Sequence, residues 1–321
     1  MSTPQPAVVA GHICLDLFPD FSRLPQGEFE AYFQPGRLVE AGPVAFATGG
    51  PVANTGLALH RLGIPVQCIA RVGDDQFGKV IRDLVSAIDP HAAAGILPVS
   101  GDQTSYSVII SPPGVDRIIL HHPGANDHFS ASDIRSDLVE QAALFHFGYP
   151  PLMCRMYQGN GEALEEVLGS ARQAGAAVSL DMAFPGEASE SAQAGWRQIF
   201  QRCLPLVDIF LPSIEELLFL YRRETYLELL RGAPGGILAQ VTPQLLSELS
   251  AELIGLGVKI VVIKLGERGL YLRCTSHADL SRMGRLPVAD PSRWANVELW
   301  SPCFQVDVVG TNGSGDATIA G

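Results

Sequence analysis

The alternation of strand-like and helix-like segments is the feature of this sequence that most constrains its fold. Short apolar runs, such as residues 66–72 and 259–266, have the length and composition of strands that are buried on both faces. Helix patterns follow such runs, and residues 162–173 form one that ends at Gly175. The strand-then-helix unit recurs about seven times. This pattern predicts an α/β fold with a doubly wound, mainly parallel sheet covered by helices on both faces.

The chain is long and apolar enough to bury a large core. It has 321 residues, of which 47% are hydrophobic and 17% are charged. These values suit one large α/β domain, or a large domain with a small one, and they exclude a disordered chain. We expect residues 1–321 to form a single domain.

Charge, cysteine usage and hydrophobic runs exclude several classes of partner. A net charge of -12 disfavours nucleic acid and anionic membranes. The six cysteines are scattered without a C-x-x-C pair, which predicts buried thiols in a reducing compartment and neither a zinc site nor a disulfide framework. The tandem His121 and His122 have no carboxylate or cysteine nearby at ligand spacing, so we expect no metal there. No run approaches the roughly 18 apolar residues that span a bilayer, so we expect a cytoplasmic protein.

Two stretches interrupt the alternation and predict a small accessory sheet. Residues 17–48 are rich in Pro, Gly and aromatic residues and contain only short alternating pieces. Residues 104–110 and 117–122 are β-rich and flank a Pro-Pro-Gly turn, which predicts a hairpin. We expect these pieces, within about 17–48 and 101–123, to pair as a lid over the ligand side.

The first strand is expected at residues 7–11, and residues 12–16 continue it to Asp16. An acid at the carboxyl end of a first strand lies where open α/β sheets bind ligands. A solvated strand end or a helix cap is the alternative role for Asp16.

Two later stretches have less regular patterns, and a predicted strand follows them. Residues 222–242 look like an insertion, and residues 276–301 look like loop. Residues 304–309 are expected to form the last strand before the glycine-rich end of the chain.

The end of the chain combines a glycine turn with an acid. Gly313, Ser314 and Gly315 would leave backbone N–H groups unpaired at a helix N-terminus, which is an anion site. Asp316 would repel a phosphate, but it suits a base that takes a proton from a hydroxyl attacking phosphorus, while the amides hold the developing charge. The alternative is an ordinary glycine turn with Asp316 as a helix-start residue.

Two other helix starts carry polar side chains. The pair Gly49 and Gly50 would let the backbone approach a ligand closely, with Asn54 in the first turn reaching hydroxyls. Tight helix–sheet packing with Asn54 as a cap is the alternative. Ser213 and Glu216 have the spacing of a capping box, and the alternative role of Glu216 is contact to magnesium through water.

Several of these stretches together resemble the PfkB (ribokinase-like) carbohydrate kinases. Residues 49–63, which begin Gly-Gly-Pro-Val-Ala-Asn, are similar to that family's first signature, and residues 72–78 resemble its companion. Residues 313–317, Gly-Ser-Gly-Asp-Ala, are similar to the core of the second signature. The resemblance runs from about residue 7 to the end, with the motifs in the family's order.

The resemblance implies an ATP-dependent kinase that phosphorylates a hydroxymethyl group of a sugar or a related small polyol or nucleoside. By it, Asp316 is the base, and the amides of Gly313, Ser314 and Gly315 form the anion hole. The positions that match sugar contacts are Asp16, Gly49, Gly50 and Asn54. The positions that match the ATP and Mg²⁺ side are Lys264, Gly266, Gly269, Ser213 and Glu216, with Glu216 reaching the metal through water.

The sequence departs from the family pattern at three places. Gly310 and Asn312 stand where the second signature has Asp and Thr, which weakens the expectation that a monovalent cation activates the protein. Ser213 stands where the family has Asn, which weakens the magnesium-side assignment. The chain stops at Gly321, so we expect the family's last helices to be missing and turnover to be impaired.

Two other classes of function stay open at this stage. One is a non-catalytic sugar- or nucleoside-binding regulatory relative with the same fold. The other is a dinucleotide-binding dehydrogenase, which is weakened because no G-x-G-x-x-G follows the first strand. The sequence does not name the sugar or nucleoside, although the absence of a basic cluster near Asp16 or Asn54 favours an uncharged one. The lid is a possible surface for a homodimer.

Overall fold

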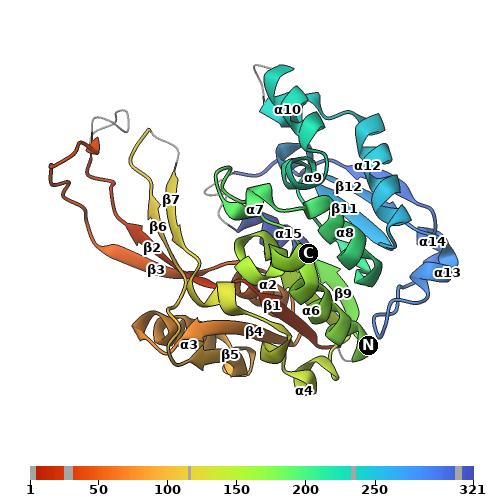
Figure 1. Cartoon of the computed structure of the whole chain (residues 1–321), viewed down its shortest axis with the longest axis horizontal. Coiled ribbons are helices and arrows are strands. Elements are labelled where there is room, and N and C mark those ends of the chain that lie inside the picture. Colours follow the sequence, from red (N-terminus) through yellow and green to blue (C-terminus); the bar gives the residue numbers. More distant parts are fainter. Residues whose placement is uncertain (1–4, 25–31, 115–116, 233–235, 308–312) are drawn as a thin grey trace.

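The computed structural model describes residues 5–24, 32–114, 117–232, 236–307 and 313–321. Within these residues, the strands form a nine-stranded sheet and a separate four-stranded sheet, here called the large sheet and the small sheet. The small sheet projects from one end of the body that the large sheet and its helices form (Figure 1). This arrangement confirms the predicted α/β fold with a second, small sheet.

The large sheet has the strand order β13-β12-β11-β10-β9-β8-β1-β4-β5. Neighbouring strands from β5 to β11 pair in parallel, whereas β12 and β13 are antiparallel additions at one edge. Its strands are β1 (Ala7–Gly11), β4 (Val66–Gly73), β5 (Gly95–Val99), β8 (Leu144–Gly148), β9 (Ala177–Leu180), β10 (Ile209–Phe210), β11 (Ile260–Lys264), β12 (Leu270–Cys274) and β13 (Glu298–Ser301).

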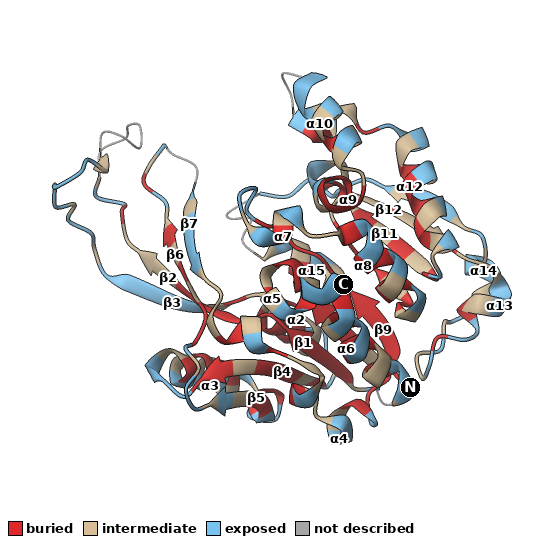
Figure 2. Ribbon diagram, viewed as in Figure 1, coloured by how far each residue is buried: buried red, intermediate tan, exposed pale blue. Residues whose placement is uncertain are grey.

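Strand β1 shows why the sequences of the central strands are unbroken apolar runs. All of its residues are buried, and its side chains alternate between two hydrophobic clusters. Val8 and Ala10 pack with Phe145 on one face, whereas Val9 packs with Cys68 on the other. A strand that is covered on both faces has no solvent-facing positions for polar residues. Figure 2 shows these buried strands between helices whose outer faces are exposed.

The helices cover both faces of the large sheet. Helices α2 and α3 contribute to the cluster around Val9, and helices α6, α8, α9 and α12 contribute to the cluster around Val8. Among the described residues, no helix is both long and apolar enough to cross a bilayer. The helices are α2 (Pro51–Arg61), α3 (Gln76–Ile88), α4 (Ser136–Val139), α5 (Cys154–Tyr157), α6 (Glu162–Gln173), α7 (Glu190–Gln193), α8 (Trp196–Cys203), α9 (Ile214–Tyr221), α10 (Arg223–Gly232), α11 (Gly236–Gln240), α12 (Pro243–Gly255), α13 (His277–Leu280), α14 (Pro291–Trp294) and α15 (Ser314–Ala320).

The small sheet has the order β3-β2-β6-β7, with β2 at Cys14–Pro19, β3 at Val44–Gly49, β6 at Tyr106–Ile110 and β7 at Ile118–His122. The predicted hairpin is the antiparallel pair β6–β7, and β2 joins it in parallel with β6. The expectation that residues 12–16 continue the first strand is wrong, because Cys14–Asp16 belong to β2. Gly11 has a φ of 118°, a conformation that favours glycine, and the chain changes sheets there.

Three other expectations need correction. The irregular insertion expected at 222–242 is not found in its described part, because α10 and α11 lie there and bury Tyr226 and Ile237 against the core. Residues 276–301 contain α13, α14 and β13, which pairs with β12 although its side chains are mostly exposed. The predicted strand at 304–309 is wrong for residues 304–307, which are not in a strand; Phe304 is 91% exposed. Residues 308–309 lie outside the described residues.

Asp75 anchors the start of α3 to the segment that leads into β6. Its carboxylate accepts hydrogen bonds from the N–H of Gly78 at 2.8 Å and from the N–H and Oγ1 of Thr104 at 2.8 and 2.7 Å. Burial raises the pKa of Asp75, but these hydrogen bonds outweigh it and hold the pKa below its ordinary value.

We predict that Asp75→Ala lowers the free energy of unfolding by about 1–2 kcal/mol, because an N-cap and its link to Thr104 are lost. The difference in the free energy of unfolding between wild type and the variant is fully present above the ordinary aspartate pKa. It shrinks as pH falls through the depressed pKa of Asp75, because the protonated carboxyl no longer accepts these hydrogen bonds as strongly. Urea denaturation at several pH values measures this. The exposed neighbour Asp74 supplies the control, and Asp74→Ala should change stability little.

Candidate active site

Asp316, near the C-terminal end of the described residues, has a buried carboxylate. It lies in the first turn of α15 and is 1% exposed. Gly313 precedes the helix with a φ of 70°, a left-handed conformation that suits glycine. Residues 308–312, which include the departures at Gly310 and Asn312, lie outside the described residues.

Two side chains from other elements hold the Asp316 carboxylate. Asn54 of α2 donates to Oδ2 at 2.9 Å, and the hydroxyl of Tyr149 donates at 3.0 and 3.1 Å to Oδ1 and Oδ2. Thr55 adds a weaker bond at 3.4 Å to the carbonyl oxygen of Asp316. Burial raises the pKa of Asp316, while the bonds from Asn54 and Tyr149 and the charge of Lys264 oppose that rise. The result is an oriented carboxylate with more affinity for a proton than an exposed one has.

Tyr149 is a site residue that the sequence reasoning missed. It follows β8 directly and has a φ of 63°, which costs a residue other than glycine on the order of 1 kcal/mol. Burial and the neighbouring Asp316 raise the pKa of its phenol, so it stays a donor. Its signal in the sequence is a hydroxylated residue just past the carboxyl end of a buried strand, before Pro150 and Pro151.

A buried ion pair lies beside α15. Nζ of Lys264, the last residue of β11, lies 2.6 Å from Oδ1 of Asp181, and the two side chains are 13% and 1% exposed. A β-carbon built on Gly315 would lie 3.9 Å from this Nζ, so the cation borders the glycine turn. Burial lowers the pKa of Lys264, but the charges of Asp181, Glu216 and Asp316 outweigh it and raise the pKa above its ordinary value.

Asp181 directly follows β9. Burial raises its pKa to about 7, although Lys264 pulls it down. Its Oδ2 atom is buried and has no hydrogen-bond partner among the described residues. A buried polar atom without a partner is uncommon and indicates a place for a ligand group.

Ser213 and Glu216 form the predicted capping box at the start of α9. The N–H of Ser213 donates to Oε2 of Glu216 at 2.7 Å, and the N–H of Glu216 donates to Oγ of Ser213 at 3.2 Å. Ser213 also forms a parallel bridge with Lys264, so the box lies next to the ion pair. Burial raises the pKa of Glu216, and Lys264 opposes that rise.

Gly49 and Gly50 lie close to two other residues of this protein, Asp16 and His12. A β-carbon on Gly49 would overlap the carboxylate of Asp16, which is buried on β2. A β-carbon on Gly50 would come within 2.6 Å of the carbonyl oxygen of His12, and Gly50 has a φ of 85°. The ring of His12 lies 6.1 Å from that of Tyr149, so this group continues toward Asp316.

The structure thus divides the expected site residues into neighbouring groups. Asn54 contacts Asp316, Asp16 lies against Gly49, and Lys264 lies beside Ser213 and Gly315. Gly266 and Gly269 flank the short turn between β11 and β12, two and five residues beyond Lys264.

A doubly wound sheet, a projecting small sheet and a buried acid at the start of α15 define a ribokinase-like α/β protein. A profile of the pfkB family carbohydrate kinases matches residues 7–321. The chain therefore belongs to the pfkB family of carbohydrate kinases, which removes the dehydrogenase alternative.

Several known proteins are similar to this chain in sequence or in fold. Fructokinase-1 of Zea mays is 27% identical over 148 residues, which are 45% of this chain and 44% of that protein. This match therefore spans less than half of that relative's length. An Arabidopsis thaliana ribokinase, solved with ribose and ATP, shares the fold with a TM-score of 0.66 at 21% identity, over 99% of this chain and 84% of that one. An E. coli structure described as a candidate ribokinase II in complex with ATP and Mg²⁺ has a TM-score of 0.66 at 20% identity, over 98% and 84% of the two chains.

We predict that Tyr149→Phe raises the pKa of Asp316, because the carboxylate loses a hydrogen bond that favours its charged form. Carbon-detected NMR titration of the aspartate carboxyls can follow this, with Asp316→Asn identifying the resonance. Tyr226→Phe, at a buried tyrosine of α10, is the matched control and should leave that pKa unchanged. An unchanged or lower pKa in Tyr149→Phe would contradict the hydrogen-bonding role.

Proposed function

We propose that this protein transfers the γ-phosphoryl group of ATP to a hydroxymethyl group of a sugar or of a related small polyol or nucleoside. The observation that carries the proposal is Asp316, a buried carboxylate at the start of a helix, oriented by Asn54 and Tyr149. A base must be aimed at one proton and must keep some affinity for it. Burial and two fixed donors supply these properties together.

In the proposed reaction, Asp316 accepts the hydroxyl proton while the hydroxyl oxygen bonds to the γ-phosphorus. The bond from that phosphorus to the β,γ-bridging oxygen breaks, and ADP leaves with the electron pair. The amides of Gly313, Ser314 and Gly315 at the start of α15 are the proposed donors to the phosphoryl oxygens. Lys264 borders Gly315, so its charge would act on the same oxygens.

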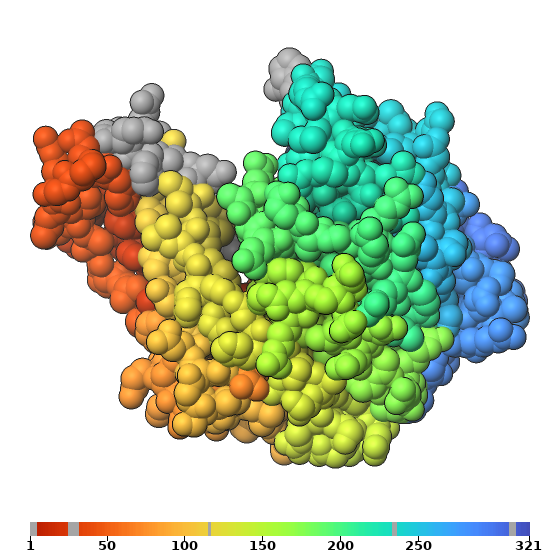
Figure 3. Space-filling view, viewed as in Figure 1, coloured from red at the N-terminus to blue at the C-terminus, as the bar shows by residue number. Residues whose placement is uncertain are grey.

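The proposed sugar side lies at the base of the small sheet. Asp16 is buried there against Gly49 and would accept hydrogen bonds from hydroxyls. Asn54 already donates to Asp316, so we assign it to positioning the base as well as to the substrate. Figure 3 shows the surface hollowed between the strands of the small sheet and the helices of the main body. Closure of the small sheet over this hollow would exclude water and suppress hydrolysis of ATP.

ATP and Mg²⁺ are the proposed co-substrate and metal. The residues present suit Mg²⁺, because the partnerless Oδ2 of Asp181 and the carboxylate of Glu216 are the oxygen donors that this ion prefers. Glu216 would act through water, since Oε2 already accepts from Ser213. When bound, the metal would neutralise phosphate charge. Lys264, Gly266 and Gly269 are proposed for the ATP side. The ATP in the Arabidopsis and E. coli structures supports ATP as the co-substrate.

A homodimer through the small sheet is a further proposal. The outer strands β3 and β7 carry apolar side chains that are about half exposed, such as Phe46 at 48% and Leu120 at 54%. Exposed apolar residues on edge strands favour pairing with a second copy.

We predict that Asp316→Asn lowers kcat by about 10²–10⁴-fold, the usual contribution of a general base. The measurement is ADP release with Mg²⁺ and ATP over a panel of sugars and nucleosides. Asp137→Asn, at an exposed aspartate, is the control and should keep full activity. A wild-type chain that is stabilised thermally by a sugar but never releases ADP would overturn the kinase proposal. That result would support a binding protein built on a kinase fold.

We also predict that Lys264→Met lowers kcat by on the order of 10²-fold, because the buried cation that would stabilise negative charge on the phosphoryl oxygens is removed. The pKa of Asp181 should rise further, since Lys264 holds it down. Lys259→Met is a matched control, because Lys259 forms a similarly buried pair with Asp208 at 2.6 Å but lies directly before the first residue of β11, away from Lys264. Both variants should lose stability, whereas only Lys264→Met should lose turnover. Equal turnover in the two variants would contradict the role of Lys264.

A further inference from the structure

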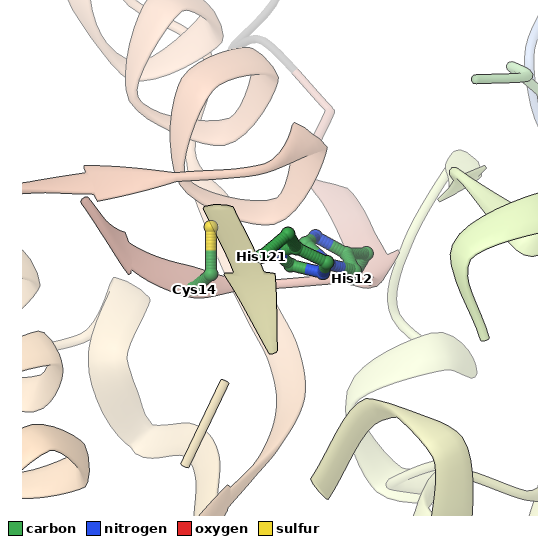
Figure 4. A group of neighbouring side chains, drawn as sticks. All are labelled: His12, Cys14 and His121. Carbon is green, nitrogen blue, oxygen red and sulfur yellow. The ribbon is translucent and has the colours of Figure 1, made fainter. Parts of the chain in front are cut away.

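Three potential metal ligands meet where the two sheets join. His12 lies between β1 and β2, Cys14 lies on β2, and His121 lies on β7 (Figure 4). One ligand atom from each lies within 4.8 Å of the other two, and the two Nε2 atoms of the histidines are 3.4 Å apart. Two nitrogens that share a tetrahedral zinc ion lie about 3.3 Å apart, which this histidine pair matches.

Spacing along the chain does not predict this cluster, because His121 has no cysteine near it in the sequence. Strand pairing brings the residues together: Asp16 lies opposite Ser107 in the β2–β6 pair, and Ser107 lies opposite His121 in the β6–β7 pair. Cys14 is two residues from Asp16 and therefore shares its face of β2. The expectation of no metal at His121 considered only spacing along the chain.

Neighbouring groups hold the possible ligands. Nδ1 of His121 lies 3.1 Å from Oγ of Ser107, and this contact orients the ring so that Nε2 faces His12. A hydrogen bond at the second ring nitrogen is what metal-binding histidines usually have. Nδ1 of His12 is buried and has no hydrogen-bond partner among the described residues. No hydrogen bond at Nδ1 therefore fixes the His12 ring in an orientation that would prevent metal binding.

We propose that His12, Cys14 and His121 bind one Zn²⁺ or a similar transition-metal cation, with water in the fourth position. Two imidazoles and a thiolate select such an ion over Mg²⁺, which prefers oxygen. This site is therefore chemically distinct from the carboxylates assigned to Mg²⁺ at Asp181 and Glu216.

Binding requires a local change at Cys14. Its thiol now donates to Oδ1 of Asp16 at 3.3 Å, and it must turn from that oxygen toward the histidines and lose its proton to solvent as the sulfur–metal bond forms. Burial raises the pKa of this thiol, so the metal must displace the proton. Burial lowers the pKa of His12 and of His121, which keeps both rings neutral and able to coordinate.

The location gives the cation a consequence for catalysis. Asp16 contacts Cys14 directly and is the proposed acceptor of substrate hydroxyls. A bound cation would draw on the same carboxylate and occupy space beside it, so we infer that the metal competes with the sugar. This consequence, unlike the metal site itself, rests on the proposed function.

The test is optical titration of the full chain with Co²⁺ alone, followed by displacement with Zn²⁺. The exposed Cys303 is replaced by Ser throughout so that it cannot bind the probe. We expect one equivalent of Co²⁺ to bind with a thiolate-to-cobalt charge-transfer band. Cys14→Ser and His121→Gln should each abolish the band.

Two matched variants control for folding and for stray binding. His122→Gln alters the adjacent histidine, whose ring lies against Tyr106, and Cys68→Ser alters a buried thiol that donates to the carbonyl of Val52. Both should keep the band, and thermal melting should show that all four variants fold. Absence of the band in the parent, or its persistence in Cys14→Ser or His121→Gln, overturns the site.

Competition is tested separately with the sugar that the ADP-release panel identifies. We expect Zn²⁺ to raise the KM for that sugar at least tenfold without a matching fall in kcat, and the sugar to weaken Co²⁺ binding. A band that survives saturating sugar overturns the competition but not the site. If the cobalt band appears but the chain has no kinase activity, the metal site is supported and only the proposed function is contradicted.

Discussion

One buried cation lies among three carboxylates at the carboxyl edge of the large sheet. Lys264 touches Asp181 directly, and the charges of Glu216 and Asp316 act on it as well. Removing these charges from water is costly, and their mutual attraction offsets that cost only where each is well placed. The ends of β9 and β11, the start of α9 and the start of α15 therefore depend on one another electrostatically. An excess of negative charge also remains there, which suits a site for a metal ion.

Parallel pairing explains why these groups meet. Strands from β5 to β11 run in one direction, so their carboxyl ends, and the residues just beyond them, share one edge. Asp181, Tyr149 and Lys264 all lie at or directly after strand ends there. Asp16 of the small sheet and His12, which lies between β1 and β2, form a second polar group. Tyr149 connects the two, since it bonds to Asp316 and lies against His12.

Much of the architecture was predictable from local pattern. The helix at 162–173 and the central strands followed from periodicity, because burial on one or two faces leaves a direct signature in sequence. The errors have physical causes. Short α10 and α11 are held by packing of Tyr226 and Ile237 rather than by a long amphipathic pattern. Strand β13 is mostly exposed and depends on hydrogen bonds to β12, while the apolar run beginning at Phe304 has no strand partner in its described part.

The sequence by itself determined the alternating α/β design, the glycine turn before Asp316, the capping box of Ser213 and Glu216, and the family resemblance that the profile match bears out. These features depend on residues close together along the chain, so their spacing is readable. Only the tertiary structure decided that Tyr149 orients Asp316, that Lys264 pairs with Asp181, and that His12 and Cys14 lie beside His121. Those contacts join residues about 80 to 170 positions apart or from different strands of the small sheet. Strand order and register set them, and no local pattern encodes either one.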